Sequence, residues 1–435
     1  MKVAFSTLGC RVNQYESEAM AEKFLREGYE IVDFSEVADV YVVNTCTVTN
    51  MGDKKSRQII SKARRLNEKA IIAVVGCYSQ LAPDKVSAID GVDVVLGTRN
   101  KGDVVYYVNK AMDEGKIQVH VDGVLKNKVF EDLNIEEYQD KTRAFLKIQD
   151  GCNRFCTYCA IPYSRGAVCS KKPEKVLSEV KRLAQNGFKE VILSGIHIAS
   201  YGLDLEEKID LVKILEEVEK IEGIERVRIG SIEPAFFTDE VVNKIKNMKK
   251  LCPQFHLSLQ SGCDSVLSRM NRRYNTDEYK HIVNVLRDNI KDVSITTDVI
   301  VGFPGETKEE FNETYNFLKD IKLTKTHVFK YSKRTGTRAA AMDNQVDGKV
   351  KEERSKLLIE LNDINEKLFN EKFIAREMKV LLEQEVKGKE GIFEGYTRNY
   401  IKVEVEGASR DQIGTFVNCK INKAYSDRMT GELVR

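Results

Sequence analysis

The sequence predicts an α/β protein of three parts: a flavodoxin-like parallel sheet, an open partial TIM (β/α)6 barrel, and a small antiparallel β-barrel. Strand-like and helix-like segments alternate through residues 1–140, and a strand–helix unit then repeats six times. The last part instead carries short strands separated by turns that contain glycine. At 435 residues the chain exceeds the usual size of a single domain, so domains of 1–140, 141–370 and 371–435 are expected.

The first domain is expected to be a mainly parallel sheet with helices between its strands. Short apolar or β-branched runs predict strands at 3–7, 30–34, 39–44, 71–75 and 92–96. Helical periodicity predicts helices at 16–27, 54–66 and 101–113. Ligands of such sheets bind beyond the carboxyl ends of the strands.

The middle domain carries the repeated strand–helix units. Its strands are predicted at 145–149, 190–194, 226–230, 255–259, 293–301 and 326–331. A helix is expected at 173–186, because Pro173 suits a first helical turn and Gly187 suits a helix end. Active sites in barrels gather at the carboxyl ends of the strands, so the site is expected there.

A charged helix at 349–372 leads into the last domain. Short strands are predicted at 378–386, 391–395, 400–406, 416–424 and 432–434. Such small barrels often bind RNA, but many only pack against a neighbouring domain, and the composition does not choose between these roles.

Composition favours a reduced, soluble protein. No run of eighteen apolar residues occurs, and residues 1–6 lead directly into a strand rather than a signal peptide. A cytoplasmic protein with no membrane partner is therefore expected. The ten cysteines favour metal ligation over disulfides in so large a chain. The net charge of +2 does not exclude nucleic acid, because a balanced total can hide a local basic patch.

Three cysteines follow the first strand of the middle domain with the spacing C-x-x-x-C-x-x-C: Cys152, Cys156 and Cys159. Structural zinc sites and ferredoxin-type clusters use four protein ligands, whereas this loop supplies three. A 4Fe-4S cluster held by three cysteines leaves one iron open to a substrate. An iron–sulfur cluster is the favoured interpretation, and the alternative is a zinc site completed by Cys169 or His197.

A second set of three cysteines is expected at the edge of the first sheet. Cys10, Cys46 and Cys77 each come just after a predicted strand. Carboxyl ends of parallel strands share one edge, so the three sulfurs are expected to lie close together. One such cysteine is most often a small buried hydrophobe, but three at equivalent strand ends favour a second three-thiolate site.

Polar residues also follow the barrel strands. Glu233, Gln260 and Asp298 lie inside or just beyond apolar strands, where burial without a partner would cost about 1–3 kcal/mol each. A polar ligand, or one another, is expected to satisfy them, and an ordinary strand-end hydrogen bond or salt bridge is the alternative. For His197 alone a structural role is favoured.

Two basic clusters are expected to flank the proposed ligand cavity at the carboxyl ends of the strands. One lies on the predicted helix after Cys46 and the other after the last barrel strand: Lys54, Arg57, Lys62 and Arg65, then Lys330, Lys333, Arg334 and Arg338. A solvated charged face is the ordinary interpretation of a basic helix. Two clusters beside one cavity favour a phosphate backbone as the partner.

Together these motifs resemble the radical S-adenosylmethionine methylthiotransferase family over the whole chain. The signatures are residues 151–166, 231–234 (Ser-Ile-Glu-Pro), 257–262 (Leu-Ser-Leu-Gln-Ser-Gly), 270–274 and 298–307. Residues 8–18 are similar to the branch that modifies threonylcarbamoyladenosine at position 37 of tRNA. The resemblance implies an N-terminal methylthiotransferase domain, a radical S-adenosylmethionine core and a C-terminal TRAM RNA-binding domain.

The resemblance also implies S-adenosylmethionine and two 4Fe-4S clusters as cofactors, one on each cysteine set. The first would serve radical formation at carbon 2 of the adenine, and the second would hold the sulfur. The candidates for holding S-adenosylmethionine are Tyr158, Ser194, Glu233, Gln260, Arg272 and Asp298. The implied partners are a tRNA anticodon loop, a sulfur donor, and an electron donor such as flavodoxin or ferredoxin.

Three functions stay open at this point. The first is methylthio transfer to tRNA, with isopentenyladenosine as an alternative substrate. The second is the same chemistry on a ribosomal-protein aspartate, against which the residues after Cys10 argue. The third is a non-enzymatic RNA-binding protein with structural zinc.

Four further cysteines do not fit the two ligand sets. Cys169 lies where the family is not expected to carry a cysteine, and it is expected to be inert or to bind iron wrongly when the cluster is damaged. Cys252, Cys263 and Cys419 match no ligand spacing and are expected to be packing residues.

Overall fold

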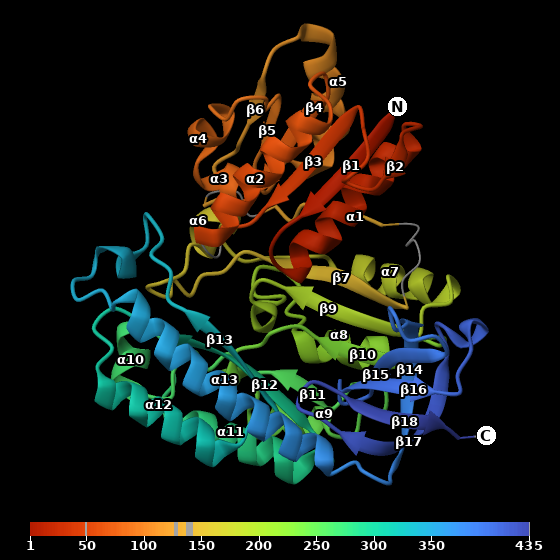
Figure 1. Cartoon of the computed structure of the whole chain (residues 1–435), viewed down its shortest axis with the longest axis vertical. Helices are drawn as coiled ribbons and strands as arrows, with labels where there is room; N and C mark the ends of the chain where they lie inside the picture. The colour runs from red at the N-terminus through yellow and green to blue at the C-terminus, as the bar shows by residue number, and fades with distance from the viewer. Residues whose placement is uncertain (48–49, 126–128, 136–141, 435) are drawn as a thin grey trace.

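The computed structural model describes residues 1–47, 50–125, 129–135 and 142–434, and the side chains of these except 50–54. It confirms the predicted α/β architecture. Figure 1 shows an N-terminal sheet in red to orange above an open barrel in yellow to cyan, with a small blue barrel at the lower right. The expected boundary between residues 140 and 141 lies outside the described residues. No helix in the described ranges is long and apolar enough to span a membrane.

The N-terminal sheet has the strand order β2-β1-β3-β4-β5-β6, and these neighbours pair in parallel. Its strands are β1 (Lys2–Thr7), β2 (Glu30–Val32), β3 (Val40–Thr45), β4 (Ile71–Gly76), β5 (Val94–Leu96) and β6 (Gln118–His120). Val40 and Val42 pack into one apolar core, and Tyr41 and Val43 pack into another. Side chains alternate along a strand, so β3 is buried on both of its faces.

The long helices of this domain lie near their predicted positions, at α1 (Arg11–Arg26), α2 (Asn50–Leu66) and α5 (Val104–Glu114), the last preceded by the 3-10 turn η1 (Lys101–Asp103). The elements α3 (Cys77–Leu81), α4 (Pro83–Ser87) and β6 were not predicted. They are too short for a helical or strand period to show in the sequence. Helix α1 begins at Arg11 rather than at Glu16, which places Asn13 and Glu16 about one turn apart on the same helix.

The barrel strands are β7 (Arg143–Asp150), β9 (Glu190–Gly195), β10 (Arg226–Ile229), β11 (Gln254–His256), β12 (Ser294–Val301) and β13 (Lys325–Lys330). Neighbouring strands pair in parallel, except that β10 and β11 are joined through isolated bridges such as Ile232–Leu257. The predicted strand 255–259 is therefore shorter than expected, and isolated bridges and side-chain hydrogen bonds hold its second half. A two-residue strand, β8 (Cys169–Ser170), adds antiparallel to the end of β7.

Helices lie around the outside of this barrel. They are α6 (Ile161–Arg165), α7 (Pro173–Gln185), α8 (Leu211–Glu219), α9 (Asp239–Ile245), α10 (Asp264–Arg269), α11 (Thr276–Asn289), α12 (Lys308–Ile321) and α13 (Gly348–Glu371). One large apolar core joins the barrel strands to these helices. Helix α13 crosses from the mouth of the barrel to the C-terminal barrel (Figure 1).

In the described chain five strands close the C-terminal barrel in the order β14-β15-β16-β18-β17. They are β14 (Glu377–Glu385), β15 (Ile392–Thr397), β16 (Lys402–Glu406), β17 (Phe416–Ala424) and β18 (Met429–Leu433). The prediction of a purely antiparallel barrel is wrong in one detail, because β16 and β18 pair in parallel. Strand directions cannot alternate all the way around a closed ring with an odd number of strands, so at least one pair must be parallel.

Arginines seat the C-terminal barrel on the amino ends of the large barrel's strands. Arg226 opens β10 and donates to the carbonyls of Tyr396 and Lys379 at 2.9 and 2.8 Å. Arg228 is buried and donates to Glu190 Oε1 at 2.6 Å and to the carbonyl of Thr397 at 2.9 Å. The C-terminal barrel is thus held at the end opposite to the carboxyl-end mouth.

Candidate active site

The loop between β7 and α6 carries the closely spaced cysteines. Gly151 opens the loop with a φ of +70°, and a Cβ there would lie 1.9 Å from the carbonyl oxygen of Ala167, so glycine is required. The N–H of Cys159 donates to the carbonyl of Cys156 at 3.0 Å. Burial raises the pKa of Cys152 to about 11 and that of Cys159 to about 12. Without metal these two thiols are protonated near neutral pH, so metal binding would release protons.

An ionic cluster lies beside this loop. Glu233, just beyond β10, is paired with Arg154 at 2.6 Å and with His197 Nε2 at 2.8 Å. Arg272 lies 3.7 Å from the same carboxylate and donates to the sulfur of Cys156 at 3.4 Å. Burial raises the pKa of Glu233, but the hydrogen bond with His197 and the charge of Arg272 outweigh burial and lower it. Glu233 is therefore an ionised carboxylate that holds two arginines beside the cysteine loop.

A cavity of about 250 Å³ opens beside the same loop. Tyr158 and Cys159 line it from the loop, and Gln260 and Asp298 line it from the barrel, so three of the residues predicted to hold S-adenosylmethionine meet there. Thr47 also lines it, and Thr47 directly follows Cys46 in the first domain. The cavity therefore lies between the two domains and close to both cysteine sets.

Two of the predicted residues differ from the rest in their local setting. Ser194 is buried, and its hydroxyl donates to the carbonyl of Leu146 at 3.2 Å, so it is bonded within the barrel wall. Gln260 has a φ of +73°, which is rare for a residue with a side chain. Its N–H donates to the carbonyl of Asp298 at 2.8 Å, and its own carbonyl accepts from Ile300 at 2.9 Å. The cavity wall is thus held in a strained conformation by β12.

The second cysteine set is gathered at one edge of the N-terminal sheet. Cys46 directly follows β3, Cys77 directly follows β4, and Cys10 precedes α1. A Cβ on Gly9 would lie 2.8 Å from the sulfur of Cys46, so the backbone beside Cys10 packs directly on Cys46. Protein packed around its sulfur raises the pKa of Cys10, and the nearby thiol of Cys77 adds to the rise. The structure therefore brings together these three residues, which are distant in sequence.

The donor sets fit clusters better than single ions. In the described part of the chain no three histidine, cysteine or carboxylate side chains surround one metal position. The thiolates of a cubane each bind a different iron, so they stand farther apart than the ligands of a single ion. Both fourth ligands considered for zinc are engaged elsewhere. Arg99 donates to the sulfur of Cys169 at 2.9 Å, and the two ring nitrogens of His197 face Ser200 and Glu233.

The remaining cysteines lie in packed surroundings. Cys252, Cys263 and Cys419 are buried, as expected for packing residues. Cys169 is also buried, and its sulfur accepts a hydrogen bond from Arg99.

The two basic clusters differ in position. Arg57, Lys62 and Arg65 are exposed on α2, whereas Lys54 lies outside the residues whose side chains the structure describes. In the second cluster Lys333 is exposed, whereas Arg334 is buried and lines the cavity. Lys330 also lines the cavity, and Arg338 opens the 3-10 turn η4 (Arg338–Ala341). The second cluster therefore reaches into the cavity as well as flanking it.

Comparison with known families and proteins assigns the chain. Residues 2–97 match the uncharacterized protein family UPF0004, residues 146–318 match the Radical SAM superfamily, and residues 371–434 match the TRAM domain. A threonylcarbamoyladenosine tRNA methylthiotransferase of Bacillus subtilis is 45% identical over all of this chain and 96% of its own length. This chain belongs to the radical S-adenosylmethionine methylthiotransferase family.

Other members of the methylthiotransferase family extend the match. An enzyme of the same name from Aquifex aeolicus is 42% identical over 94% of this chain and 97% of its own length. A tRNA-2-methylthio-N(6)-dimethylallyladenosine synthase from Clostridium tetani is 37% identical over 98% of this chain and 95% of its own. Among solved structures, a radical S-adenosylmethionine methyltransferase, TsrM, from Kitasatospora setae shares the fold. Its TM-score is 0.55 and its identity 16%, over 78% of this chain and 77% of that one.

Sequence patterns missed several residues of this methylthiotransferase site. Arg154 and His197 pair with Glu233, although neither was expected to contribute. Glu16 and Lys101 are buried ions of the first domain that pair with each other, and Glu16 also pairs with Lys147 of the middle domain. A charged residue on the apolar face of a predicted helix can indicate a buried ion. Glu16 gave no such signal, because the predicted helix began at residue 16 whereas α1 begins at Arg11.

Proposed function

We propose that this protein transfers a methylthio group to carbon 2 of N6-threonylcarbamoyladenosine at position 37 of tRNA. The observation that carries the proposal is that two three-cysteine sets flank one cavity, which Cys159 and Thr47 line from opposite domains. The identity of 45% to a threonylcarbamoyladenosine enzyme, against 37% to a dimethylallyladenosine enzyme, favours the first substrate.

The cysteine loop would hold a 4Fe-4S cluster that binds S-adenosylmethionine, and Cys10, Cys46 and Cys77 would hold a second cluster. When bound, these groups supply one-electron chemistry and the sulfur, both of which an unactivated adenine carbon requires. Tyr158, Gln260 and Asp298 line the cavity and would orient the bound S-adenosylmethionine. Arg272, held by Glu233, would fix the cysteine loop through its bond to Cys156. An electron donor such as flavodoxin or ferredoxin and a sulfur donor would complete the cycle.

Each domain has a proposed part in the reaction on tRNA. Residues 1–140 would carry the sulfur site, residues 141–370 the radical site, and residues 371–435 the RNA-binding barrel, to which the TRAM match corresponds. A single-stranded anticodon loop can present a splayed base to the cavity. Because the C-terminal barrel is seated on the amino ends of the strands, it would contact tRNA away from the reacting base. Arg57, Lys62, Arg65 and Lys333 are exposed and would contact phosphates nearer the cavity.

Nucleoside analysis tests the proposed substrate. The anaerobically reconstituted protein is incubated with S-adenosylmethionine, a reductant and tRNA that carries threonylcarbamoyladenosine without the methylthio group. Mass spectrometry of the digested tRNA is expected to show conversion to the methylthio nucleoside. A matched tRNA with isopentenyladenosine is expected to stay unmodified, and its preferential conversion would contradict the proposed substrate.

Replacing Glu233 with glutamine is expected to raise the KM for S-adenosylmethionine about tenfold or more. The carboxylate is 6% exposed and pairs with Arg154, Arg272 and His197, and hydrogen bonds to charged groups contribute about 1.5–3 kcal/mol each. Steady-state production of 5′-deoxyadenosine measures the effect. Glu240→Gln removes an exposed ion pair to Lys244 and serves as the control. An unchanged KM in Glu233→Gln would show that this carboxylate does not help to bind S-adenosylmethionine.

A further inference from the structure

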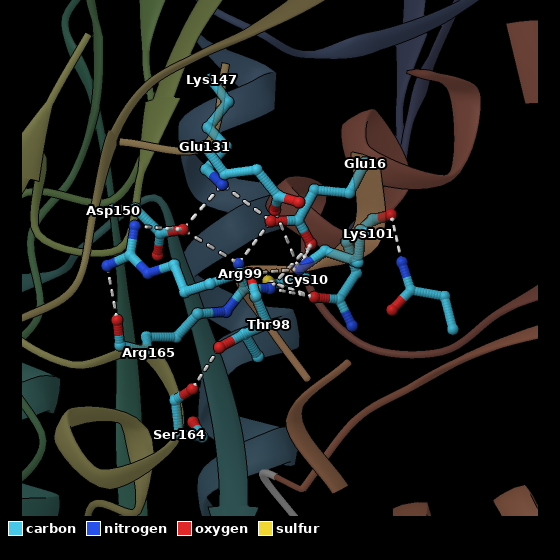
Figure 2. Close-up of polar contacts among 12 residues, drawn as sticks. Cys10, Glu16, Thr98, Arg99, Lys101, Glu131, Lys147, Asp150, Ser164 and Arg165 are labelled. Carbon is cyan, nitrogen blue, oxygen red and sulfur yellow. Dashed lines mark hydrogen bonds and ion pairs between the residues drawn. The ribbon is translucent and has the colours of Figure 1, made fainter. Parts of the chain in front are cut away.

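A buried ionic network joins the two cysteine sets across the domain junction. Its members come from α1, from the segment around η1, from the loop after β6, from β7 and from α6, and Figure 2 shows them converging. Within the described residues it contains four cations and three carboxylates: Arg99, Lys101, Lys147 and Arg165, with Glu16, Glu131 and Asp150. Charges removed from water are costly unless they are paired, so this arrangement fixes how the two domains meet.

Arg165 is the member that links the two sets of cysteines. It ends α6, six residues after Cys159, and its side chain is fully buried. Its two terminal nitrogens bind the Glu16 carboxylate at 2.5 and 3.0 Å, and one also donates to Asn13 Oδ1 at 2.5 Å. A bidentate arginine–carboxylate pair fixes direction as well as distance. Arg165 therefore ties the helix that follows Cys10 to the helix that follows the cysteine loop.

The guanidinium of Arg165 also faces the second cysteine set. Figure 2 shows it extending toward Glu16, on the side of the network where Cys10 lies. Asn13 connects Arg165 to Cys10, because its Oδ1 accepts from Arg165 at 2.5 Å and lies 3.9 Å from the sulfur of Cys10. The Nε–H of Arg165 is buried and has no hydrogen-bond partner among the described residues. A buried donor left unpaired is costly, so a polar group at this site would satisfy it.

We propose that Arg165 is a positioning residue for the sulfur site. It holds Cys10 and Cys77 against the cysteine loop of the middle domain. It also directs its charge and its unpaired Nε–H toward the anionic group that Cys10, Cys46 and Cys77 carry. This inference rests on the proposed function, because it presumes a cluster on those three cysteines. An oxidised 4Fe-4S core with three thiolates carries one net negative charge, and the network has a surplus of one positive charge among the described residues. The two therefore balance, and Arg165 is the network cation that bonds to Asn13 beside Cys10.

The test isolates the second site in the full-length chain. Cys152, Cys156 and Cys159 are all replaced by alanine, and the protein is reconstituted anaerobically with iron and sulfide. Arg165→Gln and Arg165→Lys are then introduced separately. Three quantities are measured: iron per chain, the reduction potential by electron paramagnetic resonance at poised potentials, and the affinity for methanethiolate by titration of the same signal.

Arg165→Gln is expected to retain iron, to lower the reduction potential, and to weaken methanethiolate binding tenfold or more. The potential falls because a nearby cation stabilises the reduced and more negative cluster. Arg165→Lys keeps a positive charge but lacks the planar guanidinium group. The reduction potential is therefore expected to return toward that of the parent, while methanethiolate binding stays weakened. Loss of folding alone would not produce this separation between the two readouts.

Arg99→Gln is the matched control. Arg99 belongs to the same network, but its guanidinium bonds to the carbonyl of Arg165 and the sulfur of Cys169 rather than to Glu16. An equal effect of Arg99→Gln would overturn the inference, because the loss of any buried cation would then explain the result. Unchanged potential and affinity in Arg165→Gln would also overturn it, and if that variant does not fold, unchanged methanethiolate affinity in Arg165→Lys would do so. A parent variant without iron would contradict the proposed two-cluster function itself, and the inference with it.

Discussion

Replacing Cys46 with alanine is expected to abolish methylthio transfer to tRNA while S-adenosylmethionine is still cleaved to 5′-deoxyadenosine. Cys46 is buried just after β3, and the backbone of Gly9 packs against it, so in the proposed sulfur site its thiolate would be one of the three ligands. Alanine removes one sulfur and little volume. Parallel assays of the methylthio nucleoside and of 5′-deoxyadenosine measure the two activities separately.

Two further variants make this result interpretable. Cys156→Ala is expected to abolish both activities, because Cys156 belongs to the loop that serves S-adenosylmethionine. Cys252→Ala is expected to retain both, because Cys252 is buried at the start of β11, away from the cavity. A Cys46→Ala protein that still forms the methylthio nucleoside would show that the N-terminal cysteines do not deliver the sulfur.

Replacing Glu16 with alanine is expected to lower the free energy of unfolding by about 3–5 kcal/mol, the usual cost of removing one partner from a buried ion pair. Glu16 is fully buried and pairs with Arg165 at 2.5 Å, Lys147 at 2.8 Å and Lys101 at 3.3 Å. Its removal leaves these cations with less compensation at the domain junction. Chemical denaturation measures the loss, and Glu22→Ala on the same helix, which breaks a pair to the half-exposed Arg26, is the control. Equal stability of the two variants would contradict the importance of the network.

The same carboxylate predicts how stability depends on pH. Burial raises the pKa of Glu16, but Arg165, Lys101 and Lys147 outweigh burial and lower it to about 2. A carboxyl with a depressed pKa stabilises the fold above its unfolded value of about 4.3, and that stability is lost as the pH falls toward the folded value. Unfolding free energies measured from pH 5 down to pH 2 should therefore fall more steeply in the parent than in Glu16→Gln. Identical slopes would show that Glu16 does not carry this charge in the folded protein.

The strand pattern predicted most of the fold, because apolar runs such as those of β3 and β4 are buried on both faces and show plainly in the sequence. The short strands and the strand pairings were harder to predict. The two-residue β8 and the parallel pairing of β16 with β18 depend on contacts between distant segments, and local propensity does not contain such contacts. Likewise, β11 is shorter than its apolar run, because beyond His256 isolated bridges and side-chain hydrogen bonds replace the regular strand pairing.

The grouping of the cysteines could be predicted because each set follows a rule that the sequence shows. One follows local spacing, and the other follows equivalent ends of parallel strands. The residues that orient them have no such rule. Arg165 and Glu16 meet across 149 positions of chain, and Arg154 meets Glu233 only after the barrel has closed. Ser194 stays a prediction, and its hydroxyl bonds to the carbonyl of Leu146 in the barrel wall.

Iron per chain is the most direct measure of two separate cluster sites. The protein is purified anaerobically and reconstituted, and iron is counted in the wild type and in the variant with alanine at Cys152, Cys156 and Cys159. Two cubane clusters predict about eight irons in the wild type and about four in the variant. About four irons in the wild type, falling to none in the variant, would leave only the radical site. Zinc in place of iron would contradict radical chemistry at both sets of cysteines.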